Sequence, residues 1–220
     1  MAAQPGAPFS INDIVPIANH LTEAGVVAVK ADSPYKTIEE LVAAAKEKGN
    51  LKASTNGNKA SNHTAAQLLA KSAGFKYKAI PYGGTADQLL ALRQGEVDFT
   101  CAKVADVAKL VKGDKPELRV LAVFNTKRDP ELPNVPTLGE KGLYPEWYGS
   151  ARALVAPKGT KPEVIQYYVE AFKKTMQDPA VIEAHKKAGM ALDFKDNKEL
   201  GDLIKAQDKF ARDVVNDLYQ

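Results

Sequence analysis

Two junctions of similar composition constrain the fold of this chain more than any other feature. Each places small, polar and flexible residues between a strand-like pattern and a helical pattern, at residues 51–63 and again at residues 79–85. Helical patterns follow directly, over residues 64–72 and 86–92. Free backbone N–H groups at a helix start attract anions. Two such starts close together predict a site for a small carboxylate that needs no catalytic group.

Short apolar runs alternate with amphipathic patterns along the chain. The expected strands lie at residues 25–30, 52–54, 76–80, 97–101, 118–124 and 151–156. Further helices are expected at residues 37–49, 104–111, 160–176 and 198–218. Three pairs fit the capping-box pattern, namely Thr37 with Glu40, Thr85 with Gln88, and Thr160 with Glu163. The alternation predicts an α/β fold with a mostly parallel sheet.

The composition argues against several classes of protein. The chain has 220 residues, a formal net charge of +3 and 26% charged residues, with acidic and basic side chains interleaved, so no nucleic-acid partner is expected. The single cysteine, Cys101, rules out an intramolecular disulfide and a cysteine-only zinc site. No apolar run approaches the roughly 20 residues that span a bilayer. No signal peptide is visible, so we expect either a cytosolic protein or one whose leader has been removed.

Signals for an enzyme are weak. The three histidines show no metal-ligand spacing, and no Gly-x-Ser-x-Gly, Walker or Gly-x-Gly-x-x-Gly motif occurs. Cys101 ends an expected buried strand, where a small apolar side chain is favoured over a catalytic thiol. For His63, a structural hydrogen bond at the helix start is favoured over contact with a ligand. We therefore expect no catalytic residue, no metal and no cofactor.

Signals for ligand binding are stronger at the two junctions. Hydroxyl and amide side chains flank the flexible Gly57 in the first, and Tyr82 precedes two glycines in the second. Each junction alone is equally well explained as a capped helix. Their shared position at the carboxyl ends of strands, where ligands collect in open sheets, favours binding. The adjacent aromatic residues Trp147 and Tyr148 are expected to pack in the core, with a ligand wall as the alternative.

Short motifs spread over most of the chain resemble one known family in their order and spacing. They lie at residues 9–17, 26–34, 37–41, 53–63, 81–84, 95–98, 118–123, 127–128, 132–137, 147–149 and 156–160. Each motif is weak alone. Together they resemble the periplasmic substrate-binding proteins of tripartite tricarboxylate transporters, the TctC or Bug family.

The resemblance implies a type II periplasmic binding protein, an α/β fold whose two lobes of mixed, mostly parallel sheet close over a small organic carboxylate. Residues 27–123 would form the complete second lobe, and residues 1–26 and 124–220 part of the first. The resemblance further implies a non-enzymatic periplasmic protein that delivers its ligand to membrane transporter subunits. The candidate ligand-binding residues are Thr55, Asn56, Gly57, Asn58, Ser61, His63, Tyr82, Gly83, Gly84, Thr85, Trp147 and Tyr148.

The chain departs from the family pattern in two ways. Lys59 and Ala60 stand where the family usually has Gly and Ser. Lys59 either adds a cation near the ligand or occupies the tip of a solvated loop. The family's N-terminal part, with its signal peptide, first strand and Pro-Gly-Gly loop, has no counterpart, which suggests a fragment, a shortened protein or a misassigned start. We expect an incomplete first lobe that a partner chain or self-association covers.

Two alternative functions stay open. A truncated α/β domain that binds no solute would act through oligomerisation or a partner chain. A small α/β enzyme would need a nucleophile–base pair, with His63 within hydrogen-bond reach of a reactive serine or cysteine.

Overall fold

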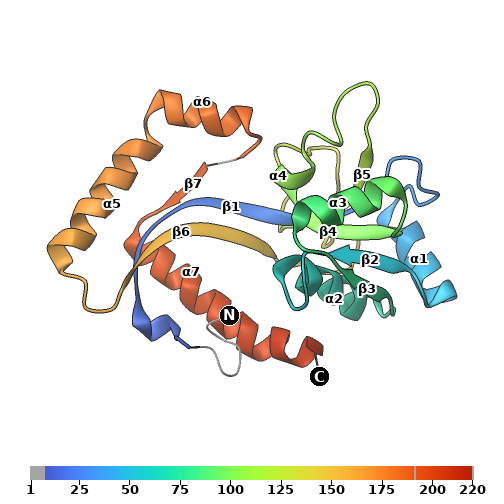
Figure 1. Cartoon of the computed structure of the whole chain (residues 1–220), viewed down its shortest axis with the longest axis horizontal. Helices are drawn as coiled ribbons and strands as arrows, with labels where there is room; N and C mark the ends of the chain where they lie inside the picture. The colour runs from blue at the N-terminus through green and yellow to red at the C-terminus, as the bar shows by residue number, and fades with distance from the viewer. Residues whose placement is uncertain (1–7, 191, 220) are drawn as a thin grey trace. The chain divides into compact units, whose positions relative to one another are not determined.

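The computed structural model describes residues 8–190 and 192–219, and the chain divides into two units. One unit is Glu23–Ser150, and the other combines the described residues up to Thr22 with those from Ala151 onward. The chain passes between them within β1 (Ile14–Lys30) and within β6 (Gly149–Pro157) (Figure 1). The observed division differs from the expected one, which placed residues 27–123 in one lobe. One reason is that the first half of β1 contains polar residues, so the sequence pattern predicted a strand only over residues 25–30.

The unit Glu23–Ser150 is built on strands in the order β3-β2-β4-β1-β5. These strands include β2 (Lys52–Thr55), β3 (Lys78–Pro81), β4 (Phe99–Lys103) and β5 (Leu118–Phe124). β2 pairs in parallel with β3 and β4, whereas β1 pairs antiparallel with β4 and β5. The expected α/β fold with a mixed sheet is confirmed. Parallel pairing puts the carboxyl ends of β2, β3 and β4 at one edge of the sheet.

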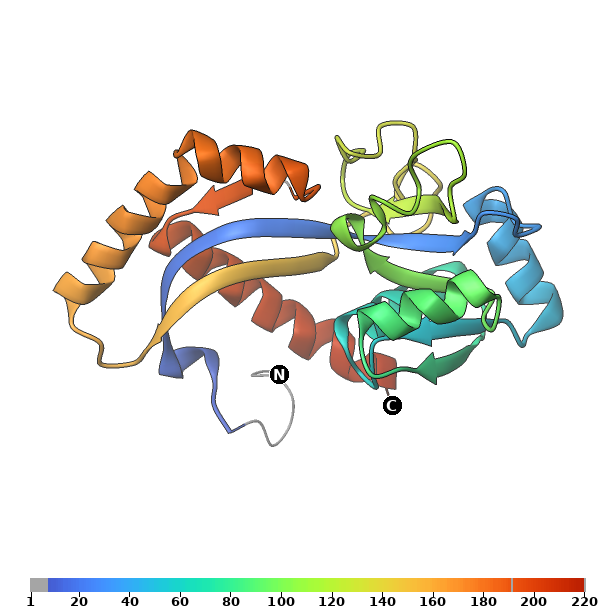
Figure 2. The same ribbon diagram turned by 45° about the horizontal axis from the view of Figure 1, so that its top comes forward.

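Helices cover both faces of this sheet. They are α1 (Ile38–Lys48), α2 (Ser61–Ala73), α3 (Thr85–Gln94) and the short α4 (Val104–Val107). The connections from β2 to β3 and from β3 to β4 cross the sheet in opposite directions, so right-handed connections place α2 and α3 on opposite faces (Figure 2). On one face, Leu92 of α3 packs in a core cluster with Ala102 of β4. On the other, Phe75, which follows α2, contacts the Phe99 ring.

The first expected helix cap is confirmed at α1, and the second is wrong at α3. The Thr37 hydroxyl accepts a hydrogen bond from the Glu40 N–H at 3.2 Å. At α3 the N-cap is Gly84, and Thr85 is already the first helical residue. Gln88 is fully buried, because its amide finds partners on β2 and β4 that the helix start does not offer.

Residues 125–148 belong to the unit Glu23–Ser150, although the family resemblance implied that they belong to the other lobe. Thr137 forms a parallel bridge with Val123 of β5, and Leu132 is buried in the core cluster of this unit. The segment contains several prolines and lacks periodicity, so its core contacts cannot be recognised from the pattern alone.

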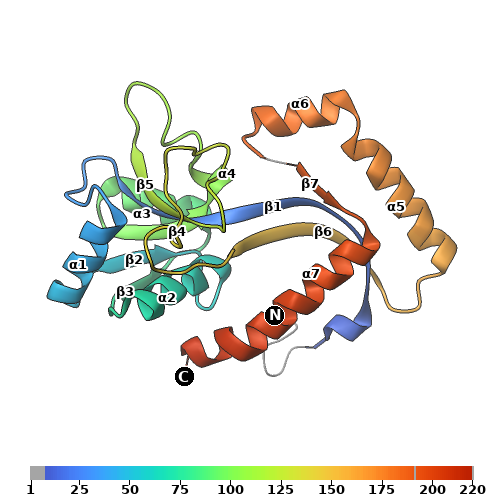
Figure 3. The same ribbon diagram turned by 180° about the vertical axis from the view of Figure 1, so that it is seen from behind.

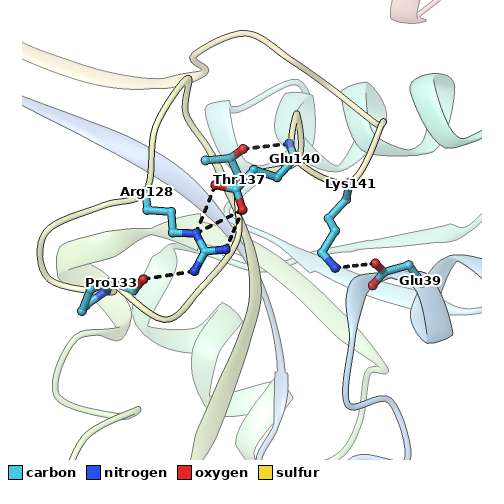
Figure 4. Close-up of polar contacts among 6 residues, drawn as sticks. All are labelled: Glu39, Arg128, Pro133, Thr137, Glu140 and Lys141. Carbon is cyan, nitrogen blue, oxygen red and sulfur yellow. Dashed lines mark hydrogen bonds and ion pairs between the residues drawn. The ribbon is translucent and has the colours of Figure 1, made fainter.

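Polar contacts connect this segment internally and to α1 (Figure 4). The Arg128 guanidinium makes a two-pronged contact with the Glu140 carboxylate, at 2.8 Å from Nη2 to Oε2 and 3.1 Å from Nε to Oε1. Lys141 reaches Glu39 of α1 at 2.7 Å. These ion pairs are largely exposed, so solvent screens them and each contributes little to stability. The buried apolar contacts therefore hold the segment in place.

The other unit pairs the first half of β1 with β6 and with β7 (Leu192–Lys195). Both views in Figures 1 and 2 show β6 beside β1. The helices of this unit are α5 (Pro162–Met176), α6 (Pro179–Lys187) and α7 (Asn197–Phe210), with short turns η1 (Ile11–Asp13), η2 (Ala211–Val215) and η3 (Asn216–Tyr219) (Figure 3). Ile17 of β1 packs with Ile165 and Val169 of α5 in its core.

The third expected capping box, at α5, is also wrong. The N-cap residue is Lys161, because Pro162 occupies the first helical turn, a position that suits its fixed φ angle. The Thr160 hydroxyl instead donates to the Pro157 carbonyl at 2.8 Å.

Candidate ligand-binding site

The structure places the two junctions of the sequence side by side. The first joins β2 to α2 and the second joins β3 to α3, and the two strands pair in parallel up to Thr55 and Pro81. The Tyr82 N–H then donates to the Thr55 carbonyl at 2.9 Å, which ties the second junction to the first. Two helix starts therefore lie at the same edge of the sheet.

Neither helix start is capped by its own N-cap residue. The N-cap residue is Ala60 in α2 and Gly84 in α3, and neither makes a side-chain hydrogen bond there. Asn56 supplies a partial substitute at α2, since its Oδ1 accepts from the Asn62 N–H at 3.3 Å. The alternative that the junctions are ordinary capped helices is therefore not supported, because neither N-cap residue makes the capping side-chain hydrogen bond. N–H groups of the first turns can donate to an anion.

The loop of the first junction turns through two residues with positive φ, Gly57 at 120° and Lys59 at 56°. This left-handed conformation is unfavourable for lysine and accessible to glycine. The Lys59 N–H donates to His63 Nδ1 at 3.0 Å. Burial lowers the pKa of the His63 imidazole, which favours the neutral ring that can accept this bond. The structural role expected for His63 is confirmed, and its contact with a ligand stays a prediction.

The second junction exposes its backbone while its phenol is engaged elsewhere. Gly83 is exposed, and Gly84 and Thr85 are half-buried at the start of α3. The Tyr82 hydroxyl donates to Glu96 at 3.0 Å, and desolvation together with this carboxylate raises the pKa of the phenol. The phenol of Tyr82 is therefore occupied by Glu96. In this junction the backbone groups that follow Tyr82 are better placed than its phenol to contact a ligand.

The aromatic pair reaches the first junction through one of its members. Tyr148 is buried, and its hydroxyl donates to the Ser61 carbonyl at the start of α2, at 3.2 Å. Trp147 is half-buried and packs against the core cluster that contains Val104. Asn58, at the outer end of the loop, is exposed. The structure thus links Tyr148 to the junctions and gives Trp147 the expected packing role.

A buried polar network that the sequence analysis did not identify lies beneath the junctions. The Gln88 Nε2 atom is 3.2 Å from the Ser54 carbonyl oxygen, 2.6 Å from that of Cys101 and 2.5 Å from Thr100 Oγ1. The Gln88 Oε1 atom accepts from Asn62 Nδ2 at 2.9 Å. All of these side chains are buried, so each bond is made where water cannot replace it.

Lys103 extends this network at the carboxyl end of β4. Its side chain is 3% exposed, and Nζ donates to Asn62 Oδ1 at 2.5 Å and to Ser61 Oγ at 3.3 Å. Burial lowers the pKa of the ammonium group, and the Asp106 carboxylate opposes this shift. Within the described part of the chain, Lys103 forms no ion pair. The sequence analysis did not identify Lys103 as a candidate site residue.

Cys101 is expected to react with a thiol reagent such as Ellman's only after unfolding. Its side chain is fully buried in β4, and burial raises the pKa of the thiol to about 12. Both access and the thiolate fraction are therefore low in mildly alkaline buffer, and we expect labelling roughly 100-fold slower than in denaturing urea. Comparing the two labelling rates by absorbance checks this, and rapid labelling of the native chain would contradict it.

Two kinds of feature are absent from residues 8–190 and 192–219. No cluster of three or more His, Cys, Asp and Glu side chains there could hold a metal ion. None of the helices described is long and apolar enough to cross a membrane.

Comparison with known proteins agrees with this picture. The model of the tripartite tricarboxylate transporter family receptor matches residues 4–218. A UPF0065 protein of Cupriavidus necator is 37% identical over 170 residues, which cover 77% of this chain and 50% of the relative. One from Pseudomonas sp. strain P51 is 31% identical over 210 residues, covering 92% and 61%. The chain therefore spans about half to three-fifths of the length of these curated relatives.

Solved structures share the fold. A TctC solute binding protein from Polaromonas, without ligand, is 27% identical with a TM-score of 0.81, over 96% of this chain and 72% of that one. MatC from Rhodopseudomonas palustris, with bound malate, is 22% identical with a TM-score of 0.83, over 97% and 74%.

The mixed α/β fold is that of periplasmic binding proteins, as the match to the Polaromonas TctC solute binding protein shows. The chain belongs to the TctC family of tripartite tricarboxylate transporter receptors. The resemblance found in the sequence motifs is thereby confirmed. This family consists of transport receptors and not of enzymes.

Proposed function

We propose that this chain is part of an extracytoplasmic solute-binding protein that captures a small organic carboxylate for a tripartite tricarboxylate-type transporter. The observation that carries the proposal is the pair of helix starts, tied together by the hydrogen bond from the Tyr82 N–H to the Thr55 carbonyl. Their first-turn N–H groups converge at one sheet edge, where they can donate to one anionic group.

The proposed ligand contacts are backbone N–H groups and short polar side chains of the two junctions. The proposed residues are those named from the sequence, Thr55 to Asn58, Ser61, His63, Tyr82 to Thr85, Trp147 and Tyr148. Hydroxyl and amide side chains dominate this set, and it contains no arginine that could bind a carboxylate through two parallel hydrogen bonds. The proposed location is the periplasm and the proposed partners are the membrane subunits of the transporter, and family membership supports both.

A thermal-shift screen tests the proposal directly. The 220-residue chain is melted alone and with malate, succinate or citrate, with glucose as a neutral control. A ligand that binds only the folded state stabilises it, by about 2.7 kcal/mol at a concentration 100 times its Kd. We expect the melting temperature to rise with at least one acid and not with glucose. A cooperative melt that no acid shifts would contradict the proposal for this chain and favour the alternative of a non-binding domain.

The role of the backbone donors is tested at Ser61, the first residue of α2. Ser61→Pro removes one N–H group at a helical position that tolerates proline, and Ala60 before it already has the extended conformation that a following proline requires. Ser61→Ala is the matched control, because it removes the same hydroxyl and keeps the N–H. We expect the proline variant to bind the acid at least about 10-fold more weakly than the alanine variant. Equal affinities of the two variants by titration calorimetry would show that this helix start does not contribute to ligand binding.

A further inference from the structure

We propose that Lys103 is the charge-selecting residue of this site, and that its buried ammonium group binds a carboxylate of the ligand at the start of α2. This inference rests on the proposed function, since it names a determinant of specificity within the same site. It adds a cation to a set of contacts that otherwise consists of backbone groups, hydroxyls and amides.

The position of Lys103 supports this assignment. β4 ends at Lys103, at the same sheet edge as the two junctions, and Nζ lies against the first two residues of α2, Ser61 and Asn62. Only 3% of the residue surface is exposed, whereas Ser61 beside it is half-buried. The ammonium group is therefore withdrawn from bulk water and contacts the hydroxyl of a half-buried serine at the start of α2.

The Asp106 carboxylate accepts a hydrogen bond from the Lys103 backbone N–H at 3.0 Å but forms no ion pair with the Lys103 ammonium group. The N-terminal end of a helix carries a partial positive charge, so a lysine there is unfavourable and an anion favourable. Within the described residues no carboxylate lies within ion-pair distance of the Lys103 ammonium group. Burial lowers the pKa of this group, and the Asp106 carboxylate acts in the opposite direction. Two positive features in a poorly hydrated place indicate that an anionic group completes the arrangement.

The hydrogen bonds of Lys103 leave room for such a group. An ammonium group has three donors, and two are directed at Asn62 and Ser61. The contact with Ser61 Oγ, at 3.3 Å, is the longer one and can be exchanged for a carboxylate oxygen. The contact with Asn62 is short, and the Asn62 amide is itself held in place because its Nδ2 donates to Gln88 Oε1. The cation is thus fixed in position before ligand arrives, which lowers the cost of ordering it on binding.

The inference is tested by comparing an acid with its uncharged analogue. Calorimetry measures the binding of malate and of its neutral diamide, malamide, to the wild-type chain, Lys103→Met and Lys103→Arg. Lys71→Met is the control, because it removes one positive charge from the exposed far end of α2. We expect Lys103→Met to lose at least about 30-fold in malate affinity and most of the preference for malate over malamide. Lys103→Arg retains part of both, and Lys71→Met is unchanged.

The outcomes separate this inference from the proposed function. A folded Lys103→Met variant that binds malate as tightly as the wild type would overturn the inference and leave the proposed function standing. A wild-type chain that binds malate and malamide equally would overturn it as well, even if no Lys103 variant folds. A wild-type chain that binds neither malate nor any acid of the thermal-shift panel would overturn both.

Discussion

Gln88→Ala is expected to lower the free energy of unfolding by roughly 3–5 kcal/mol. The Gln88 side chain is fully buried and joins α3 to β2, β4 and α2 through the carbonyls of Ser54 and Cys101, the Thr100 hydroxyl and the Asn62 amide. Truncation leaves a cavity and several buried polar groups without a partner, and both effects destabilise the native state.

Urea denaturation followed by tryptophan fluorescence measures this effect, because Trp147 is the single tryptophan and packs against the core of the same unit. Leu90→Ala is the control on the same helix. Leu90 is 44% exposed, so we expect its unfolding free energy to change by at most about 0.5 kcal/mol. A loss below about 1 kcal/mol for Gln88→Ala would mean that the network contributes little to folding.

Gly149→Ala is expected to destabilise the unit Glu23–Ser150 by roughly 2–3 kcal/mol and to weaken ligand binding. A Cβ atom at this position would collide with the Glu23 carbonyl oxygen and lie 2.9 Å from Trp147 Cζ2. The carbonyl belongs to the backbone of β1 and cannot turn away. Relief therefore requires the segment that carries Tyr148 to shift, which removes the hydrogen bond from its hydroxyl to Ser61.

The same denaturation assay, together with the thermal shift caused by malate, checks this prediction. Ser150→Ala is the neighbouring control, because it changes a half-buried side chain without adding an atom to the contact between the strands. Its unfolding free energy should stay within about 0.5 kcal/mol of the wild type. Wild-type stability in Gly149→Ala would contradict the prediction, because it would mean that a Cβ atom fits between the two backbones.

The local features of the candidate site were predictable from the sequence. The glycine- and asparagine-rich junctions, the strands before them and the helices after them follow from residue type and periodicity over a few positions. The Thr37 cap was found in the same way, since its hydroxyl and the Glu40 N–H are three residues apart. The same local pattern failed at Gln88, because a polar residue three positions after a threonine fits both a cap and a buried network.

By itself, the sequence determined the α/β class, the two junctions at the carboxyl ends of strands and the family. Only the tertiary structure decided that the junctions lie side by side, that Gln88 points inward and that Lys103 is buried at the start of α2. It also decided that residues 125–148 belong to the same unit as these groups. The reason is distance along the chain: Ser54 and Thr100 bond across 46 residues and Lys103 reaches Asn62 across 41. Burying such polar groups is favourable only once strand order has supplied their partners.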